Sequence, residues 1–211
     1  MRKRMGVSVE PSEAMKRGAA IHTIFHETSR LVAKSVLSGY DPWDAYDYAC
    51  RLCIKRFGRD PLYAKLCRAF AFAWSSIAAE LGGPLAVTEM VVDGSALGLS
   101  RYLRIDALME GGIVVELKYG SFRRDYALAV AGYALALESY LEVPIDFGLV
   151  IAVNGDGTKL RMYPIYVDNA LRQEFIELRD EAIDILLSDV EPPTPSSCPS
   201  TCPYRPYCRG G

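Results

Sequence analysis

Long hydrophobic runs, internal repeats and an imbalance of charge are all missing from this chain of 211 residues. Because no apolar run reaches the roughly 18 residues that a membrane span needs, we expect no membrane segment. The N-terminus carries basic residues but no apolar stretch with a cleavage site, which argues against secretion and favours a cytoplasmic protein. The formal net charge of −2 excludes a generally basic protein. A nucleic-acid partner would therefore need a local basic strip, and the candidates are Arg101, Arg104, Arg123, Arg124, Lys159 and Arg161.

Half of the residues are hydrophobic and 24% are charged, an ordinary balance for one globular domain with a helical elaboration. Hydrophobic periods and capping residues predict helices first and strands later. Helices are expected from Ser12 to about Leu37, from Asp41, from Asp60 to about Gly82, from about Asp125 to Leu141, and from Asp168 to Leu187. Strands are expected at residues 86–93, 98–109, 113–119, 146–153 and 159–167. This order predicts an α/β fold with an N-terminal helical region at 1–84, a core at 85–190 and a C-terminal segment at 191–211.

Two acids and a lysine in the middle strands form the most informative pattern. Asp106 is followed ten residues later by Glu116, Leu117 and Lys118, across a Gly-Gly turn. Residues two apart in a strand share a face, so Glu116 and Lys118 project together while Leu117 points into the core. Two carboxylates offer the oxygen ligands that Mg²⁺ or Mn²⁺ prefers, and such an ion activates water for attack on a phosphate. A neighbouring lysine can orient that water or neutralise the developing charge, so the pattern predicts metal-assisted phosphodiester hydrolysis.

The hydrophobic pattern also predicts how the two strands pair. One face of the first strand is expected to carry Leu103, Ile105, Ala107 and Met109, and one face of the second Ile113, Val115 and Leu117. If both faces enter one core, odd-numbered residues must pair with odd ones. A two-residue loop prevents this pairing, whereas a three-residue loop at 110–112 allows it and sets Asp106 directly opposite Glu116. Packing and chemistry therefore require the same register.

The chain has two histidines, and one of them is a candidate ligand. His22 lies at the edge of the hydrophobic stripe of the first expected helix, and because imidazole binds metals it could complete a site with Asp106 and Glu116. A single helical histidine is also often an ordinary polar residue. His26 follows one turn later, but the sequence shows no third ligand for a zinc-type pair. Acids and lysines also occur on solvated sheet faces, so these residues alone leave both interpretations open.

The six cysteines form two groups. Three lie in helical sequence, where free cysteine usually packs as a small apolar residue: Cys50, Cys53 and Cys67. Three end the chain within eleven proline-rich residues that show no helical or strand period: Cys198, Cys202 and Cys208. In a cytosolic chain this second group favours metal or iron–sulfur ligation over disulfides. Zn²⁺ is the alternative metal, since sets of thiolates also suit it.

Taken in order, His22, Asp106, Glu116 with Lys118, and Tyr133 on the following helix resemble the RecB-like nucleases of the PD-(D/E)xK superfamily. The terminal cysteine group is similar to that of the iron–sulfur members. The stretches VDGSALGLSRYLRIDAL, VVELKYG, AGYALALESYLEVPIDFGLV and CPYRPYC look like the archaeal branch of the fourth CRISPR-associated protein family. The resemblance runs from about Pro11 to the C-terminus. It implies a restriction-endonuclease-like (RecB-like) mixed sheet flanked by helices, with an N-terminal helical insertion and a C-terminal cysteine-cluster loop.

The same resemblance implies roles for single residues. The implied ligands of Mg²⁺ or Mn²⁺ are His22, Asp106, Glu116 and the backbone carbonyl of Leu117. The implied catalytic residues are Asp106, Glu116, Lys118 and Tyr133. The implied ligands of an iron–sulfur cluster, [4Fe–4S] rather than [2Fe–2S], are Cys198, Cys202 and Cys208.

Two positions depart from the family pattern. Ala129 stands where the wider family has a glutamine four residues before Tyr133, which could weaken DNA positioning. The family's first cluster cysteine lies upstream of the histidine, and no residue before His22 is a cysteine. We therefore expect a chain that is short at its N-terminus. Its fourth cluster ligand is absent, replaced, or drawn from the helical cysteines.

The resemblance implies a metal-dependent DNA exonuclease that prefers single-stranded ends and acts in CRISPR adaptation, the acquisition of new spacers. Its implied partners are DNA, as single strands or duplex ends with overhangs, and the spacer-integration proteins, with no membrane. The main alternative is a catalytically weak scaffold of the same fold that holds DNA ends within the integration complex.

Overall fold

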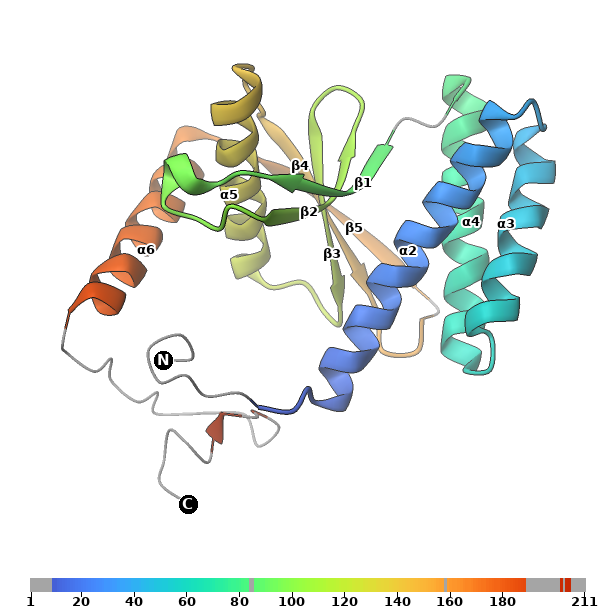
Figure 1. Ribbon diagram of the computed structural model, residues 1–211, viewed down its shortest axis with the longest axis horizontal. Coiled ribbons are helices and arrows are strands. Elements are labelled where there is room, and N and C mark those ends of the chain that lie inside the picture. The colour runs from blue at the N-terminus through green and yellow to red at the C-terminus, as the bar shows by residue number, and fades with distance from the viewer. Residues whose placement is uncertain (1–8, 84–85, 158, 189–201, 203, 206–211) are drawn as a thin grey trace.

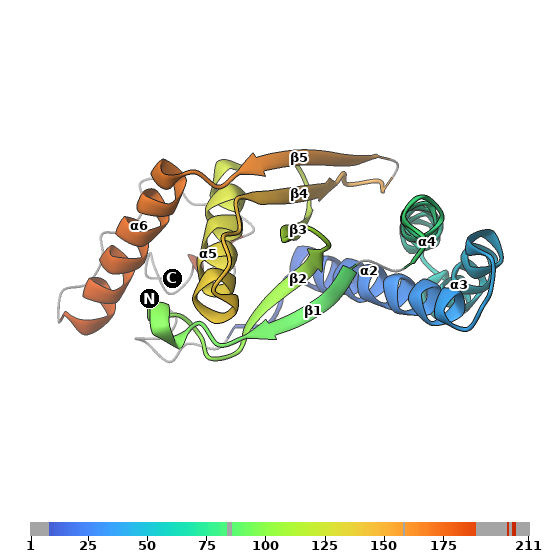
Figure 2. The same ribbon diagram turned by 90° about the horizontal axis from the view of Figure 1, so that it is seen from above.

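The computed structural model describes residues 9–83, 86–157, 159–188, 202, 204 and 205. A mixed sheet of five strands lies between two groups of helices, with α2, α3 and α4 on one side and α5 and α6 on the other (Figures 1 and 2). This arrangement confirms the predicted mixed α/β sheet flanked by helices.

The helices begin where the capping residues predict. They are α2 (Glu13–Leu37), α3 (Pro42–Phe57), α4 (Pro61–Leu81), α5 (Arg124–Leu141) and α6 (Asn169–Leu187). Four of them start at a side chain that accepts a hydrogen bond from a backbone N–H of the first turn: Ser12, Asp41, Asp60 and Asp168. Such a bond satisfies one of the donors that a helix leaves free at its start. Local sequence chemistry therefore determines these boundaries.

The strands follow one another across the sheet in chain order. They are β1 (Ala86–Val92), β2 (Leu103–Met109), β3 (Ile113–Tyr119), β4 (Phe147–Val153) and β5 (Leu160–Tyr166). The pair β3 and β4 is parallel and joined through α5, whereas the other neighbours are antiparallel. The predicted start of β2 at residue 98 is wrong. Residues Ser95–Leu97 form the short 3-10 helix η1, and Gly98 turns the chain with a φ of +68° before β2 begins.

Two hydrophobic cores lie on opposite faces of the sheet. The first joins α2, α3 and α4 to Ala107, Val115 and Leu117, and the second joins α5 to Val114 and Val150. β3 therefore contributes to both cores, because its alternate residues point to opposite faces.

The helical cysteines are buried, as predicted, but two of them are not free. Cys53 on α3 and Cys67 on α4 form a disulfide, while Cys50 remains a buried free thiol. The prediction that all three pack as free thiols is therefore wrong for this pair. The reason is that α3 and α4 pack side by side and bring the two Cα atoms to 5.6 Å, within the reach of a disulfide.

The alternation of side chains between the two cores is interrupted once in each of the first two strands, at Glu89 in β1 and at Asp106 in β2. The residues before Glu89 in β1 and after Asp106 in β2 face the core of α2, α3 and α4, which contains Ala86, Ala107 and Met109. The residues after Glu89 and before Asp106 face the α5 core, which contains Met90, Val92, Leu103 and Ile105. Glu89 has a φ of +56°, in the left-handed region that side chains other than glycine rarely adopt, and this turn of the backbone breaks the alternation. The expectation that Leu103 and Ile105 share a face with Ala107 and Met109 is therefore wrong.

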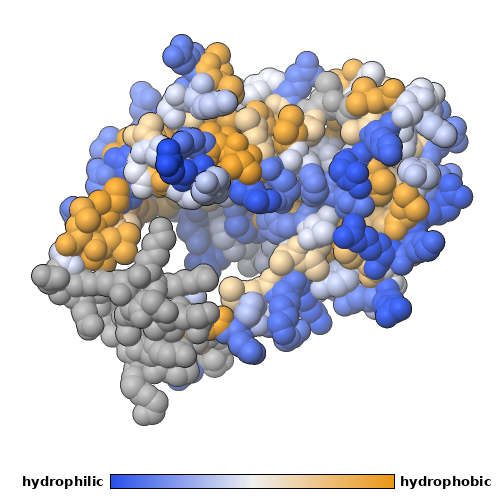
Figure 3. Space-filling view, viewed as in Figure 1, coloured by the Kyte–Doolittle hydropathy of each residue, from blue (hydrophilic) through white to orange (hydrophobic). Residues whose placement is uncertain are grey.

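The last helix is only partly covered by the described residues. α6 packs against α5, and Leu171 and Phe175 lie at the edge of the α5 core. Hydrophobic side chains gather at its C-terminal end, where Leu186 and Leu187 are exposed (Figure 3). Across the described parts of the chain, no helix has both the length and the apolar character to cross a membrane.

Candidate active site

Three acids stand next to one another on three adjacent strands. Ala107 pairs with Val115 across a three-residue loop, so Asp106 stands opposite Glu116 in the register that the hydrophobic pattern predicted. On the other side, Asp106 stands opposite Glu89, because the flanking residues of β1 and β2 are paired on both sides of it. Neighbouring strands lie about 4.8 Å apart, so the row concentrates negative charge within a few ångströms.

Asp106 links the sheet to helix α2. Its Oδ1 lies 3.0 Å from Nδ1 of His22, and its Oδ2 accepts a hydrogen bond of 2.7 Å from the backbone N–H of Leu117. The β2–β3 pairing ends at Ala107, so the carboxylate takes over an N–H that the neighbouring strand does not satisfy. The structure thus brings His22, Asp106 and Leu117 together as the sequence analysis expected. Burial lowers the pKa of His22, but the hydrogen bond and charge of Asp106 outweigh it and raise the pKa overall.

Glu116 is the most deeply buried acid of the row. Only 1% of its surface is exposed, and its Oε2 has no hydrogen-bond partner among the described residues. Burial, followed by the negative charge of Asp106, raises the pKa of Glu116 to about 7. A buried carboxylate oxygen without a partner costs free energy, and a divalent cation would satisfy it. The residues of this site therefore fit a bound Mg²⁺ or Mn²⁺ ion.

The lysine and tyrosine predicted for the site border Glu116. Lys118 forms an ion pair with Oε1 of Glu116, and its Nζ lies 5.4 Å from the ring centre of Tyr126 at the start of α5. Tyr133, seven residues further along α5, is mostly buried. Burial, and then the charges of Glu116 and Asp106, raise the pKa of Tyr133, so its hydroxyl stays protonated and can donate a hydrogen bond.

Glu89 is the site residue that the sequence analysis missed. His22, Glu89 and Asp106 each offer a ligand atom, and these three atoms lie within 4.8 Å of one another. In the sequence, Glu89 sits between Val87 and Val91 on what simple alternation makes the exposed face of an edge strand. The one available signal was an acid at the centre of a seven-residue strand whose other six residues are uncharged. The long connection from β1 to β2 hides the register that sets Glu89 beside Asp106.

A basic cavity adjoins the row of acids on the same face of the sheet. Lys118 pairs with Ala152, which in turn pairs with Arg161, so the three side chains are neighbours on one face. Arg161, Lys159 and Tyr163 line a cavity of about 350 Å³ at the ends of β4 and β5. The ring of Tyr163 stacks on Phe122 at 4.5 Å. This cavity offers positive charge and aromatic surface across β4 from Lys118.

The other candidates for a basic strip are held in ion pairs. The pairs are Arg101 with Asp93, Arg104 with Glu89, Arg123 with Asp125, and Arg124 with Glu174. Among the described residues, Lys159 and Arg161 take part in no ion pair with another side chain. The strip expected from the sequence is thus reduced to these two residues next to Lys118.

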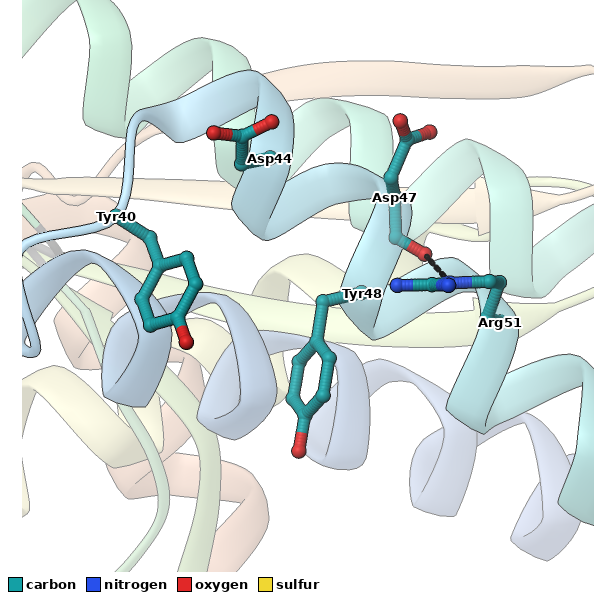
Figure 4. A pocket seen from close by; sticks show the side chains of 5 residues that line it. All are labelled: Tyr40, Asp44, Asp47, Tyr48 and Arg51. Carbon is teal, nitrogen blue, oxygen red and sulfur yellow. Dashed lines mark hydrogen bonds between the residues drawn. The ribbon is translucent and has the colours of Figure 1, made fainter.

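The remaining candidates lie elsewhere or outside the described residues. Nδ1 of His26 hydrogen-bonds the hydroxyl of Thr88, so this histidine is an ordinary polar residue between α2 and β1. Cys202 is half-buried and free, whereas Cys198 and Cys208 lie outside the described residues. A second cavity, of about 690 Å³, lies on the outer helices and is lined by Tyr40, Asp44, Asp47, Tyr48 and Arg51 (Figure 4). It contains none of the predicted site residues.

Comparisons with known proteins agree with one another on a family. The family described as CRISPR-associated exonuclease Csa1 matches residues 1–211. A protein of that description from Thermoproteus tenax is 41% identical over 133 residues, which are 63% of this chain and 46% of the relative. Another from Saccharolobus solfataricus is 40% identical over 123 residues, 57% of this chain and 42% of the relative. In both cases the matched stretch is less than half of the relative's own length.

A solved structure of a candidate exonuclease from Eubacterium rectale also matches. It is 12% identical, with a TM-score of 0.47, and the match covers 74% of this chain and 66% of that one.

Proposed function

The chain belongs to the family of CRISPR-associated exonucleases described as Csa1, and from this premise we propose that it is a divalent-metal-dependent DNA exonuclease. One observation carries the proposal. The buried Oε2 of Glu116 has no partner among the described residues, and it lies in a site that also contains Asp106 and Lys118. Once ionised, a buried carboxylate oxygen in that state is stabilised by a divalent cation.

We propose that His22, Asp106 and Glu116 hold the ion, with the carbonyl of Leu117 as a further ligand. Oxygen ligands with one imidazole suit Mn²⁺ and Mg²⁺. When bound, the ion supplies a hydroxide nucleophile and neutralises charge on the attacked phosphate. The hydrogen bond from the Leu117 N–H fixes one oxygen of Asp106, so the carboxylate is oriented before any ligand arrives.

The protein's own groups have separate tasks in this proposal. Lys118 is held by Glu116 and the Tyr126 ring, so its ammonium group faces the phosphate and stabilises the negative charge that develops there. Tyr133 remains a neutral donor beside Glu116 and Asp106, where its hydroxyl is available to the bound strand. Both tasks use preorganised groups, which need no rearrangement during the reaction.

The cavity beside Lys118 supports single-stranded DNA as the substrate. Arg161 and Lys159 can bind backbone phosphates, and the exposed parts of the Phe122 and Tyr163 pair offer a surface for an unpaired base. A strand that binds there would extend across β4 and present a following phosphate to Lys118, two strands of the sheet away from Arg161. We therefore propose that single-stranded ends are preferred over intact duplex.

We further propose that the sheet is of the RecB-like type, that Cys198, Cys202 and Cys208 bind an iron–sulfur cluster, and that the enzyme trims DNA for spacer acquisition. The support is the order of the motif residues along the chain and the family to which the chain belongs. Spacer-integration proteins are the proposed partners.

The test is cleavage of end-labelled single-stranded DNA in Mn²⁺ by the wild-type chain and by Asp106→Ala and Glu116→Ala. Both variants should lose cleavage while circular dichroism and melting show a folded protein. Glu110→Ala is the matched control, because Glu110 is an exposed acid in the turn between the same two strands and should cleave normally.

Cleavage by Glu116→Ala at the wild-type rate would remove the proposed site. If the wild-type chain binds DNA ends in Mn²⁺ but cleaves nothing, the scaffold alternative, which the alanine at position 129 leaves open, replaces the enzyme.

A further inference from the structure

We infer that Glu89 is a direct ligand of the divalent cation held by His22 and Asp106; this inference rests on the proposed metal site. It adds a residue from the edge strand β1 to a ligand set otherwise drawn from α2, β2 and β3. Ligand atoms around one cation sit about 2.0–2.6 Å from it, so atoms on opposite sides are separated by 4–5 Å. The ligand atoms of His22, Glu89 and Asp106 meet this limit, since all lie within 4.8 Å of one another.

A second observation points to a cation beside these three residues, although Glu116 is not itself part of the group within 4.8 Å. Glu116 is 1% exposed and leaves its Oε2 without a partner among the described residues, while the charge of the neighbouring Asp106 acts on it directly. Glu89 and Glu116 flank Asp106 on its two sides in the sheet. A cation bound at Asp106 would therefore help to balance three carboxylates, in addition to Lys118, Arg104 and the imidazole of His22.

The contact with Arg104 leaves Glu89 able to bind a metal. Arg104 donates from Nη1 to Oε2 of Glu89 at 2.7 Å, and the arginine side chain is 62% exposed. A carboxylate has two oxygens, so Oε1 can face the cation while Oε2 keeps the arginine. An exposed ion pair of this kind contributes little stability and does not by itself explain why an acid occupies this position.

The backbone of Glu89 makes a purely structural role harder to sustain. Glu89 and Glu142 are the non-glycine residues with positive φ in the described parts of the chain. Glu142 ends α5, where a left-handed residue is common. Glu89 lies in the middle of a strand, where glycine would adopt the same φ without a steric cost. Strain of this kind persists at sites where a side chain is needed for function.

The experiment measures Mn²⁺ binding to the metal-free chain of 211 residues by calorimetry and electron paramagnetic resonance, with Glu89→Gln and Glu89→Gly as variants. Loss of groups that merely support a metal ligand weakens affinity about 10–100-fold, so loss of a direct ligand should weaken it at least about 10-fold. Glu89→Gly should also melt at a higher temperature than the wild type without metal, because glycine removes the strain. Glu110→Gln is the matched control: it makes the same substitution at an exposed acid in the turn between β2 and β3 and should bind Mn²⁺ as the wild type does.

Wild-type Mn²⁺ affinity in both Glu89 variants, beside weakened binding in Glu116→Gln, would overturn the inference and leave the proposed function standing. Unchanged affinity in Glu116→Gln and in the Glu89 variants alike would overturn both. Weakened binding in the two Glu89 variants but not in Glu110→Gln supports Glu89 as a ligand, and the higher melting temperature of Glu89→Gly shows that this loss is not caused by unfolding.

Discussion

Lys118 has a role in this site that can be separated from metal binding. Its ammonium group touches one oxygen of Glu116 and the Tyr126 ring, while the other oxygen of Glu116 remains for the cation. We expect Lys118→Ala to lower the single-turnover cleavage rate about 10²–10³-fold, the usual loss for one charge contact made in the transition state. Mn²⁺ affinity should change little, and calorimetry checks this. Weaker DNA binding with an unchanged single-turnover rate would make Lys118 a phosphate anchor instead.

The ionisation of Glu116 and His22 should appear in thermal stability. A raised folded-state pKa means that the contribution of Glu116 is complete below its ordinary value of 4.5 and is lost as the pH rises through about 7. The raised pKa of His22 acts in the same direction. Without divalent ions, we therefore expect the wild type to lose on the order of 1–3 kcal/mol relative to Glu116→Gln between pH 5 and 8.

Mn²⁺ should reverse this trend, because metal binding requires the deprotonated ligands. Melting curves recorded across pH, with chelator and with Mn²⁺, measure both effects. Parallel pH profiles of the wild type and Glu116→Gln in chelator would contradict the assignment.

Residue-level prediction succeeded where one local rule had one answer. The three-residue turn and the odd-to-odd pairing placed Asp106 opposite Glu116 without any structure. Contacts between distant elements were harder to predict from the sequence, because His22 reaches Asp106 only once α2 packs across the sheet. The role of Glu89 could not be predicted for a different reason. The ten residues between β1 and β2 do not specify a register, and glutamate rarely adopts the left-handed backbone that Glu89 has.

At the scale of elements, capping chemistry predicted helix starts and failed to predict the start of β2. Asp41 and Asp60 accept hydrogen bonds from the first turns of their helices, so these helix starts could be predicted from the sequence. The residues from 98 to 102 were predicted as the start of this strand, but a hydrogen bond from the Gly94 N–H to the Ser100 carbonyl closes the chain into a loop before β2 begins. The disulfide between α3 and α4 could not be predicted from the sequence either, because it depends on how the two helices pack.

The hairpin of β4 and β5 carries the two basic residues that we expect to bind DNA. We expect Lys159→Ala and Arg161→Ala to weaken binding of single-stranded DNA similarly for all sequences, because backbone phosphates carry no sequence information. Each variant should also reduce the dependence of log affinity on log salt concentration by about 0.7, the value for one phosphate contact on a single strand. Fluorescence anisotropy across a salt series measures both quantities.

The matched control for the hairpin is Arg51→Ala, an exposed arginine on α3 in the cavity that contains no site residue (Figure 4). Equal losses in Arg51→Ala and Arg161→Ala would mean that the hairpin cavity does not bind the strand.

For the whole molecule, the open question is what the C-terminal cysteines do. We expect purified protein to be brown with near-ultraviolet and visible absorption, and Cys202→Ser to lose this colour and melt at a lower temperature. The reason is that a cluster bound by Cys198, Cys202 and Cys208 would tie the end of the chain to the rest of the protein. Iron and sulfide analysis beside melting curves measures both.

A companion variant, Cys50→Ser, addresses the fourth cluster ligand. Cys53 and Cys67 are joined to each other, so Cys50 is the helical thiol that remains free. Full iron content and an unchanged melt in Cys202→Ser would reject the cluster assignment, and colourless protein with bound zinc would favour the zinc alternative.

The change of face at Glu89 also has a consequence for how the molecule folds. The first half of β1 packs with the core of α2, α3 and α4, and the second half packs with the core of α5. In an ordinary strand, a slip of two residues keeps every side chain on its own face. Here the same slip would move the switch point away from Asp106 and misplace residues in both cores at once. The two cores therefore depend on the same register, and we expect them to melt together as a single cooperative unit.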